Sequence, residues 1–416
     1  MGKRQIYVMA LLAALALVAA ACGGGDTDSA ASETEPASGE NSESEGSGEP
    51  IRIGALTSLT GPFTSWGIPS STGMQLAVDE INGAGGVDGR MLELVLVDDQ
   101  SDAEEASIQI ERLHEEEVVA IGGTISSGVA GAIAPIAEEA AVPLFLSKAG
   151  SEAILTADSR YTFRTCLPAA PMIAQPFAEY AESQGFTRVG SVIADYAWGQ
   201  SFEIASADAF AALGGVELQA EVAPVPEQDF TTYLRSLEGF DPELILSTGH
   251  PPGTGSVLVQ VADLGLDVDV TGPGSSLSAV MAAAGDTAID RYIDLSCADY
   301  NSDSYADLAR RYIASSDQTF MEDDAVVGFA VVTMIAEAVA AVGDDPAAIA
   351  DYIRGESFDM PGMASPLSWT EWGELAESQL ILVRVASDGA PEGLEGNGDW
   401  WPETLIKSEP LPPFEP

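Results

Sequence analysis

The sequence predicts an α/β protein made of two doubly wound parallel-sheet lobes, and three observations lead to this prediction. The chain has 416 residues, more than a single hydrophobic core usually supports. Its apolar content of 46% is sufficient for two cores and argues against a wholly disordered acidic chain. After Pro50, short apolar runs alternate with helical patterns, and this rhythm occurs twice in succession.

The first lobe is expected to contain four short strands with helices between them. Its first helix carries apolar residues at Met74, Ala77, Val78 and Ile81, the spacing of one helical face. Glycines in 82–86 end this helix. Strands are expected at 51–56, 91–97, 118–121 and 142–146, and further helices through about 103–113 and 128–141.

The second lobe is expected to begin near Pro168, where the alternation restarts. Its strands are expected at 189–193, near 216, at 244–246 and near 268. In parallel sheets of this kind, ligands bind in the loops that leave the carboxyl ends of the strands. Those loops are 57–67, 122–128, 147–151, 195–201, 248–255 and 272–276, and they are rich in Gly, Ser and aromatic residues.

The N-terminal segment 1–21 is expected to be a signal peptide. Lys3 and Arg4 precede an apolar run that ends in small residues before Cys22, the layout of a secretory signal. The stretch 18–22 resembles a bacterial lipobox, although Ala19 stands where leucine is usual. The resemblance implies that Cys22 is lipidated; an ordinary signal peptide with a chance cysteine is the alternative.

Residues 22–50 are expected to form a disordered acidic tether between the lipid and the folded body. From Gly23 to Pro50 the chain has eight carboxylates and no Lys, Arg, aromatic or large aliphatic residue. Such a segment cannot bury enough apolar surface to offset the entropy lost on ordering.

The charge of the whole chain excludes several classes of function. There are 66 acidic and 16 basic residues, a formal net charge of −50. Nucleic-acid binding needs clustered Lys and Arg, and docking on an anionic membrane surface needs a basic patch. Two histidines and three cysteines also leave few ligands for the usual zinc sites, so we expect no metal and no cofactor.

An enzyme is not expected. The sequence lacks the nucleophile elbow, the zinc-protease motif, the Walker sequence and the dinucleotide fingerprint. A Ser-His-Asp triad would have to recruit His114 or His250 without a supporting pattern. An extracellular hydrolase is kept as the least favoured alternative.

A series of short motifs runs through the expected strands and loops. They are, in order, Ile53-Gly54-Ala55, Thr60-Gly61-Pro62, Gly85–Gly89, Val97–Asp99, Ile121–Gly123 with Ser126 and Ser127, Tyr161–Thr165 and Tyr196–Gly199. Together these motifs resemble the branched-chain amino acid (Leu/Ile/Val)-binding protein family, whose members are solute receptors of ABC importers with the type I periplasmic binding fold. The resemblance implies lobes formed by 51–167 plus 299–376 and by 168–298 plus 377–416, joined by a three-strand hinge and closing on the ligand.

The resemblance assigns ligand-binding roles in two loops of the first lobe. It places Ser126 and Ser127 where the family binds the ligand carboxylate, and a helix N-terminus with free amides suits that role. The next loop, Ala149, Gly150 and Ser151, would supply a carbonyl and a hydroxyl to the ligand. The alternative for Ser126 is that it only caps a helix.

Three larger side chains are implied to contact the ligand. The family's aromatic residue after the first strand corresponds to Trp66, and its aromatic residue in the second lobe corresponds to Trp198. A second-lobe tyrosine corresponds to His250. Alternatively, the tryptophans only pack the lobes together, and His250 is a solvent-facing loop residue.

The sequence departs from the family at Gly274, where amino-acid binders have an acid that pairs with the ligand ammonium. A buried ammonium without a carboxylate is costly. Either another acid substitutes, with Asp195 and Asp299 as candidates, or the ligand is not an α-amino acid. An amide, urea, or an aromatic or aliphatic carboxylate are therefore alternatives to a branched-chain amino acid.

Cys166 and Cys297 remain as a pair once Cys22 is lipidated, in an oxidising compartment. The resemblance places them on the first and second crossings between the lobes, which run side by side. It therefore implies a disulfide between them; two buried free thiols are the alternative.

Together, these expectations describe a lipid-anchored binding protein on the extracytoplasmic face of the cell membrane. It would act as a monomer that delivers a small ligand to an ABC permease and its ATPase, contacting the membrane only through Cys22 and binding no nucleic acid. A lipid-anchored ligand sensor with the same fold is the further alternative.

Overall fold

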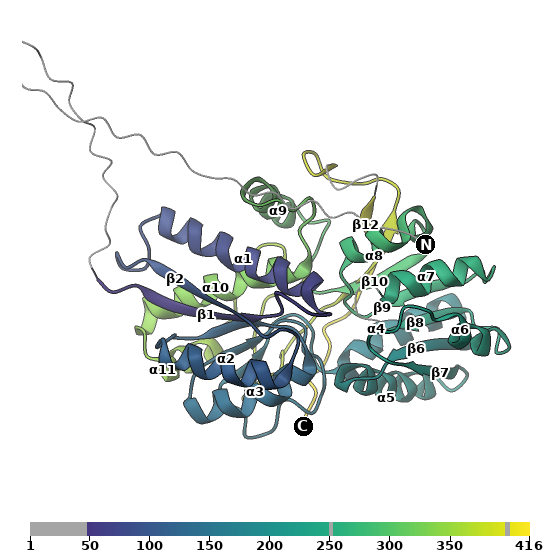
Figure 1. The fold of residues 1–416 in the computed structure, drawn as a ribbon, viewed down its shortest axis with the longest axis horizontal. Coiled ribbons are helices and arrows are strands. Elements are labelled where there is room, and N and C mark those ends of the chain that lie inside the picture. The colour runs from purple at the N-terminus through teal and green to yellow at the C-terminus, as the bar shows by residue number, and fades with distance from the viewer. Residues whose placement is uncertain (1–47, 249–252, 396–399) are drawn as a thin grey trace, which may run out of the picture. The chain divides into compact units, whose positions relative to one another are not determined.

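The described residues form two mixed α/β lobes, each organised around its own sheet (Figure 1). The computed structural model describes residues 48–248, 253–395 and 400–416. The expected signal peptide, Cys22 and nearly all of the expected tether lie outside the described residues, as does His250.

The first lobe is built on a five-stranded sheet in the order β2-β1-β3-β4-β5, in which every pairing is parallel. Its helices α1 and α10 pack together, and so do α2 and α3; Figure 1 shows these two pairs on opposite sides of the sheet. The strands are β1 Ile51–Thr57, β2 Leu92–Asp98, β3 Ile121–Thr124, β4 Leu144–Leu146 and β5 Thr162–Arg164. The helices are α1 Thr64–Gly83, α2 Ala103–Glu115, α3 Ser127–Ala140, α9 Asp303–Ser315, α10 Asp323–Val342 and α11 Pro346–Gly355.

The second lobe is built on a seven-stranded sheet in the order β12-β11-β10-β9-β8-β6-β7. Its strands are β6 Arg188–Ala194, β7 Glu217–Ala223, β8 Leu244–Ser247, β9 Asp269–Gly272, β10 Tyr292–Ser296, β11 Ile381–Ala386 and β12 Trp401–Lys407. Its helices are α4 Ala170–Gln184, α5 Ala197–Ala212, α6 Thr231–Glu238, α7 Gly253–Asp263, α8 Leu277–Ala284 and the short 3₁₀ helix η1 Gly285–Ala288.

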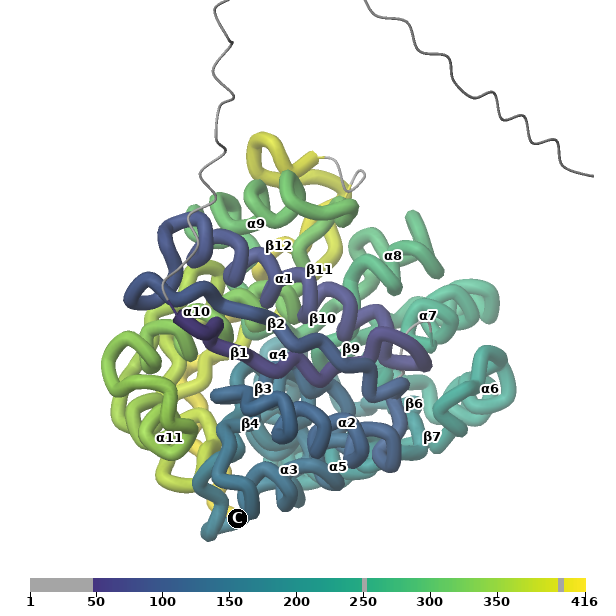
Figure 2. The backbone as a smooth tube through the Cα atoms, turned by 60° about the vertical axis from the view of Figure 1, so that its left-hand side comes forward, coloured from purple at the N-terminus to yellow at the C-terminus, as the bar shows by residue number. Residues whose placement is uncertain are grey.

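The last two strands of this sheet differ from the expected all-parallel pattern. Strand β11 pairs antiparallel with both β10 and β12, and Figure 2 shows these C-terminal strands, in yellow, beside β10. Pro402 lies in β12, the edge strand, the position where a residue without an N–H is tolerated.

The expected third strand at 118–121 was wrong by three residues, because β3 spans Ile121–Thr124. The glycine at position 122 led to the expectation of a loop, but in the structure Gly122 lies within β3 and allows helices to pack closely on the strand. A Cβ at Gly122 would lie 2.9 Å from the Val331 side chain on α10 and 3.1 Å from the Met74 side chain on α1. Helices on that face can approach β3 only if the strand has no side chain there.

Helix α10 is a core helix of the first lobe. Among the described residues it is the one helix whose length and composition would allow it to cross a membrane, but most of it is buried inside the protein. It contacts α1, α11 and β3, so its apolar residues are accounted for by packing.

The chain passes between the two sheets three times, after β5, after β10 and between α11 and β11. The second and third passages are hydrogen-bonded to each other: the Ala364 N–H donates to the Cys297 carbonyl at 2.8 Å, and the Asp299 N–H donates to the Gly362 carbonyl at 2.8 Å.

Candidate functional site

A pocket lies where loops of the two lobes meet. These loops leave the carboxyl ends of parallel strands, from β1, β3, β4 and β5 in the first lobe and from β6, β8 and β9 in the second. The lining residues are Phe63, Trp66, Ile125, Ser126, Ser127, Lys148, Leu167, Tyr196, Trp198, Thr248, Pro273, Gly274 and Ser275.

Aromatic side chains from both lobes form the apolar walls. The ring of Phe63 lies 5.7 Å from that of Trp66 and 5.7 Å from that of Tyr196, across the boundary between the lobes. The indole N–H of Trp66 donates to the carbonyl of Gly274 at 3.1 Å, also across this boundary. Trp66 and Trp198 therefore line the pocket and at the same time connect the lobes.

The N-terminus of α3 supplies the polar end of the pocket. Ser126 is the N-cap residue in an extended conformation, and its side chain makes no capping hydrogen bond. The Ser127 hydroxyl accepts a hydrogen bond from the Ser151 N–H at 3.2 Å. Both serines are buried and line the pocket, where the helix end favours a negatively charged group.

The loop Ala149–Ser151 does not line this pocket. The carbonyls of Ala149 and Ser151 accept hydrogen bonds from the buried guanidinium of Arg164. The Ser151 hydroxyl pairs with that of Ser201 in the second lobe at 2.8 Å. A Cβ at Gly150 would lie 2.5 Å from the Trp198 ring, so the glycine lets this ring pack on the backbone of the opposite lobe.

Lys148 is a pocket residue that was not expected from the sequence. Its Nζ lies 2.8 Å from both carboxylate oxygens of Asp323, 3.8 Å from Asp324 and 3.3 Å from the carbonyl of Gly274. Burial opposes the charged form, but the buried acids around Lys148, Asp323 foremost, outweigh this effect and raise the pKa of Lys148 above its usual value. Lys148 is therefore a charged ammonium inside the pocket wall.

Gly274 adopts a left-handed backbone conformation, with φ of 85°. The N–H groups of Gly274 and Ser275 donate to the Asp294 carboxylate at 3.1 and 3.0 Å. A Cβ at Gly274 would lie 3.3 Å from Lys148 Nζ and 3.1 Å from the Leu167 side chain. A side chain at 274 would thus be in tight contact with Lys148 and Leu167.

The two candidate substitutes for an acid at 274 lie elsewhere. Asp195 is exposed and accepts a hydrogen bond from Gln200 at 2.8 Å. Asp299 accepts from the Asn301 N–H at 3.3 Å. Neither lines the pocket, and none of the described lining residues is Asp or Glu.

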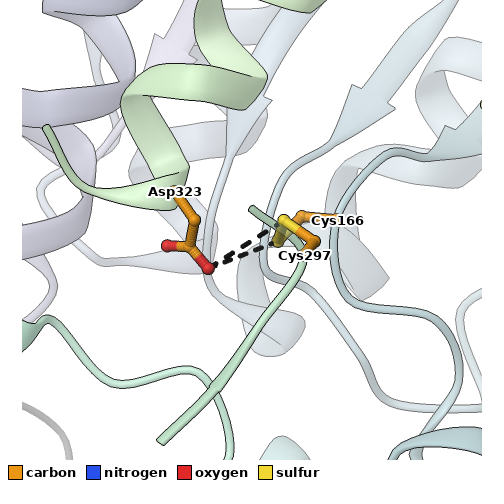
Figure 3. Close-up of side chains that lie close together, drawn as sticks. All are labelled: Cys166, Cys297 and Asp323. Carbon is orange, nitrogen blue, oxygen red and sulfur yellow. Dashed lines mark hydrogen bonds between the residues drawn. A yellow bond between two sulfur atoms is a disulfide. The ribbon is translucent and has the colours of Figure 1, made fainter. Parts of the chain in front are cut away.

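Cys166 and Cys297 form a disulfide between the first and second passages, with their Cα atoms 5.3 Å apart. Asp323 faces this bond (Figure 3), and its Oδ2 lies 3.7 and 3.9 Å from the two sulfur atoms. Three such residues could in principle hold a metal, but sulfurs joined in a disulfide are not thiolate ligands. Asp323 thus connects the disulfide to Lys148 in the pocket wall.

Several residues that line the pocket, Lys148 and Leu167 among them, were not named as site residues from the sequence. All except Leu167 lie in the strand-end loops expected to bind ligand, so the loop rule could have found them. Lys148 carried a further signal, because it is one of only three lysines in a strongly acidic chain. The remaining residues of this kind are Phe63, Ile125, Tyr196, Thr248, Pro273 and Ser275.

Two hinged α/β lobes with a lined pocket between them define a bilobal solute-binding protein of the ABC transporter type. The chain belongs to the periplasmic binding protein family, whose profile matches residues 50–390. This is a family of transport proteins that bind solutes.

Relatives and solved structures agree with this assignment. The leucine-, isoleucine-, valine-, threonine- and alanine-binding protein of Pseudomonas aeruginosa is 24% identical over 81% of this chain and 90% of its own length. A solute-binding protein of R. palustris in complex with benzoate has a TM-score of 0.76 at 22% identity, covering 88% of this chain and 98% of that one. LivJ of Streptococcus pneumoniae in complex with isoleucine has a TM-score of 0.74 at 22% identity, covering 86% and 100%.

Proposed function

We propose that this chain captures a small carboxylate with an apolar body between its lobes and delivers it to the permease of an ABC importer. The residues that line the pocket are the main support for this proposal. Aromatic walls from both lobes suit a hydrocarbon body, while the N-terminus of α3 and the ammonium of Lys148 favour a carboxylate.

The mechanism is capture followed by closure. In the open form the first lobe binds the ligand through Ser126, Ser127 and Trp66. The second lobe then closes with Trp198 and buries it, a population shift driven by contacts that only the closed form makes. The cross-lobe hydrogen bond from Trp66 to Gly274 is one such contact. Binding and release in this scheme need no covalent step and no cofactor.

Two ligand classes fit a carboxylate with an apolar body. The names of the Pseudomonas aeruginosa relative and of LivJ favour a branched-chain amino acid. The benzoate complex of the R. palustris protein favours an aromatic acid. An amide or urea would use the hydroxyl groups of the pocket but not its ammonium. A role as a ligand sensor would use the same pocket.

Anchoring through Cys22 completes the proposal. A lipid on Cys22 and the acidic tether 22–50 would keep the lobes near a membrane permease on the extracytoplasmic face. The proposed lobes are 51–167 plus 299–376 and 168–298 plus 377–416. Replacing Cys22→Ser should release the protein from the membrane fraction; retention there would contradict lipid anchoring.

A thermal-shift screen of carboxylates, amino acids, amides and urea, followed by calorimetry, tests the ligand class. Ser126→Ala and Trp198→Ala should each weaken carboxylate binding about tenfold or more while the protein remains folded. Ser206→Ala is a matched control, since this buried serine lies on α5 outside the pocket. Unchanged affinity in both pocket variants would contradict the site, and turnover of a ligand would favour a hydrolase.

A further inference from the structure

We infer that the pocket selects carboxylates that lack an α-amino group, because the chain's own Lys148 ammonium occupies the place in which a ligand ammonium would need a carboxylate partner. The inference rests on the proposed function and narrows its ligand class. It starts from the charged groups in and behind the pocket wall.

The pocket wall offers a cation and no anion. Lys148 is buried and lines the pocket, and no carboxylate stands among the described lining residues. A Cβ at position 274 would lie 3.3 Å from Lys148 Nζ, a tight contact. An acid is therefore absent at this point of the wall, where the neighbouring charged group is the ammonium of Lys148.

Two acids behind the wall are already engaged, and a third, Asp324, lies 3.8 Å from Lys148 Nζ and does not line the pocket. Asp323 binds Lys148 through both oxygens at 2.8 Å. Asp294 accepts the N–H groups of Gly274 and Ser275 at 3.1 and 3.0 Å. A ligand ammonium would thus meet the positive charge of Lys148 with no carboxylate among the described lining residues of the pocket, and burying an unpaired charge is unfavourable.

The same pocket wall favours a ligand carboxylate. It would be placed between the N-terminus of α3 at Ser126 and the ammonium of Lys148, both of which favour negative charge. The faces of Trp66 and Trp198 can accept a flat or branched hydrocarbon body. They could also attract an ammonium through its interaction with the ring face, which is the competing outcome that the experiment must detect.

The test is calorimetric titration of the purified chain with two pairs of ligands that differ only in the α-amino group. The pairs are 4-methylpentanoate with L-leucine, and 3-phenylpropanoate with L-phenylalanine. In each pair the amino-free acid should bind about 100-fold tighter. Equal affinity, or tighter binding of the amino acids, would overturn the inference while leaving carboxylate capture intact. Absence of binding by all four would overturn the proposed ligand class and the inference with it.

Variants of Lys148 distinguish selectivity from general affinity. Lys148→Met frees the Asp323 carboxylate, so the preference should reverse toward the amino acids. If this variant does not fold, Lys148→Met combined with Asp323→Asn removes both charges, and the preference should fall to less than about tenfold. Lys407→Met is the matched control: Lys407 donates to the Ala364 carbonyl outside the pocket, and the wild-type preference should persist. Persistence of that preference in the Lys148 variants would overturn the role of Lys148.

Discussion

At the scale of single residues, the most unusual feature is a set of buried charges behind the pocket. Asp324 is fully buried, and neither of its carboxylate oxygens makes a hydrogen bond within the described residues. The ammonium of Lys148 lies 3.8 Å away and is bound more closely by Asp323. Burial raises the pKa of Asp324 well above its ordinary value, although Lys148 opposes this.

Replacing Asp324→Asn should change how stability depends on pH. Because burial raises the pKa of Asp324 in the folded chain, the folded chain keeps a proton on this carboxyl group. The unfolded chain releases the same proton once the pH exceeds the ordinary pKa of Asp, about 4. The free energy of unfolding therefore falls as pH rises through this window. The substitution should remove up to about 1.4 kcal/mol per pH unit of that decline.

Urea unfolding followed at several pH values between about 4 and 8 measures this slope. Asp208→Asn, which changes an exposed acid on α5, should leave the slope unaltered. The same slope in wild type and Asp324→Asn would show that Asp324 is not a buried proton-binding group.

At the scale of elements, the residue that precedes α10 in the first lobe forms hydrogen bonds with the N-terminus of α8 in the second. Glu322, which immediately precedes α10, accepts hydrogen bonds from the N–H groups of Leu277 and Ser278 at 3.2 and 2.8 Å, and from the Ser276 hydroxyl at 3.1 Å. A carboxylate at a helix N-terminus is a favourable arrangement. Burial raises the pKa of Glu322, although these hydrogen bonds oppose the shift.

Glu322→Gln should weaken ligand binding by about fivefold to tenfold, because a neutral amide oxygen caps α8 less strongly and the closed form loses one cross-lobe contact. Calorimetry gives the affinity, and small-angle scattering with bound ligand reports whether the lobes close. Glu337→Gln, which alters a residue near the C-terminal end of α10 that pairs with Tyr352, should have no effect. Wild-type affinity in Glu322→Gln would argue against this contact as a closing element.

Much of the element order could be predicted from the sequence, because strand and helix periodicities are local. The strand-end loops that the sequence suggested as ligand-binding loops supply most of the pocket lining, since parallel sheets direct the carboxyl ends of their strands to one edge. The predicted bounds of strand β3 were wrong because Gly122 allows packing against Val331, which lies more than 200 residues away in the chain. The role of Lys148 was not predictable, because its partner Asp323 is 175 residues distant.

At the scale of the whole molecule, the net charge of −50 opposes the approach of an anionic ligand. The local field of α3 and Lys148 must overcome this repulsion. Because long-range repulsion is screened by salt more than a buried contact is, the two effects can be separated experimentally.

Binding of an anionic ligand should therefore strengthen with moderate salt. The screening length falls from about 30 Å at 0.01 M ionic strength to about 8 Å at 0.15 M, which removes most of the repulsion from distant surface acids. Affinity for benzoate, measured by calorimetry across this range, should rise, whereas affinity for neutral benzamide should stay constant. Steady weakening of benzoate binding with salt would contradict this account.

The central claim is that a ligand carboxylate binds at the N-terminus of α3 with its apolar body between the two lobes. A crystal structure of the chain with bound 3-phenylpropanoate tests it most directly. We predict the carboxylate at Ser126 and Ser127, the phenyl ring beside Trp66 and Trp198, and Lys148 still paired with Asp323. A ligand bound outside this pocket, or bound with its carboxylate directed away from α3, would contradict the account.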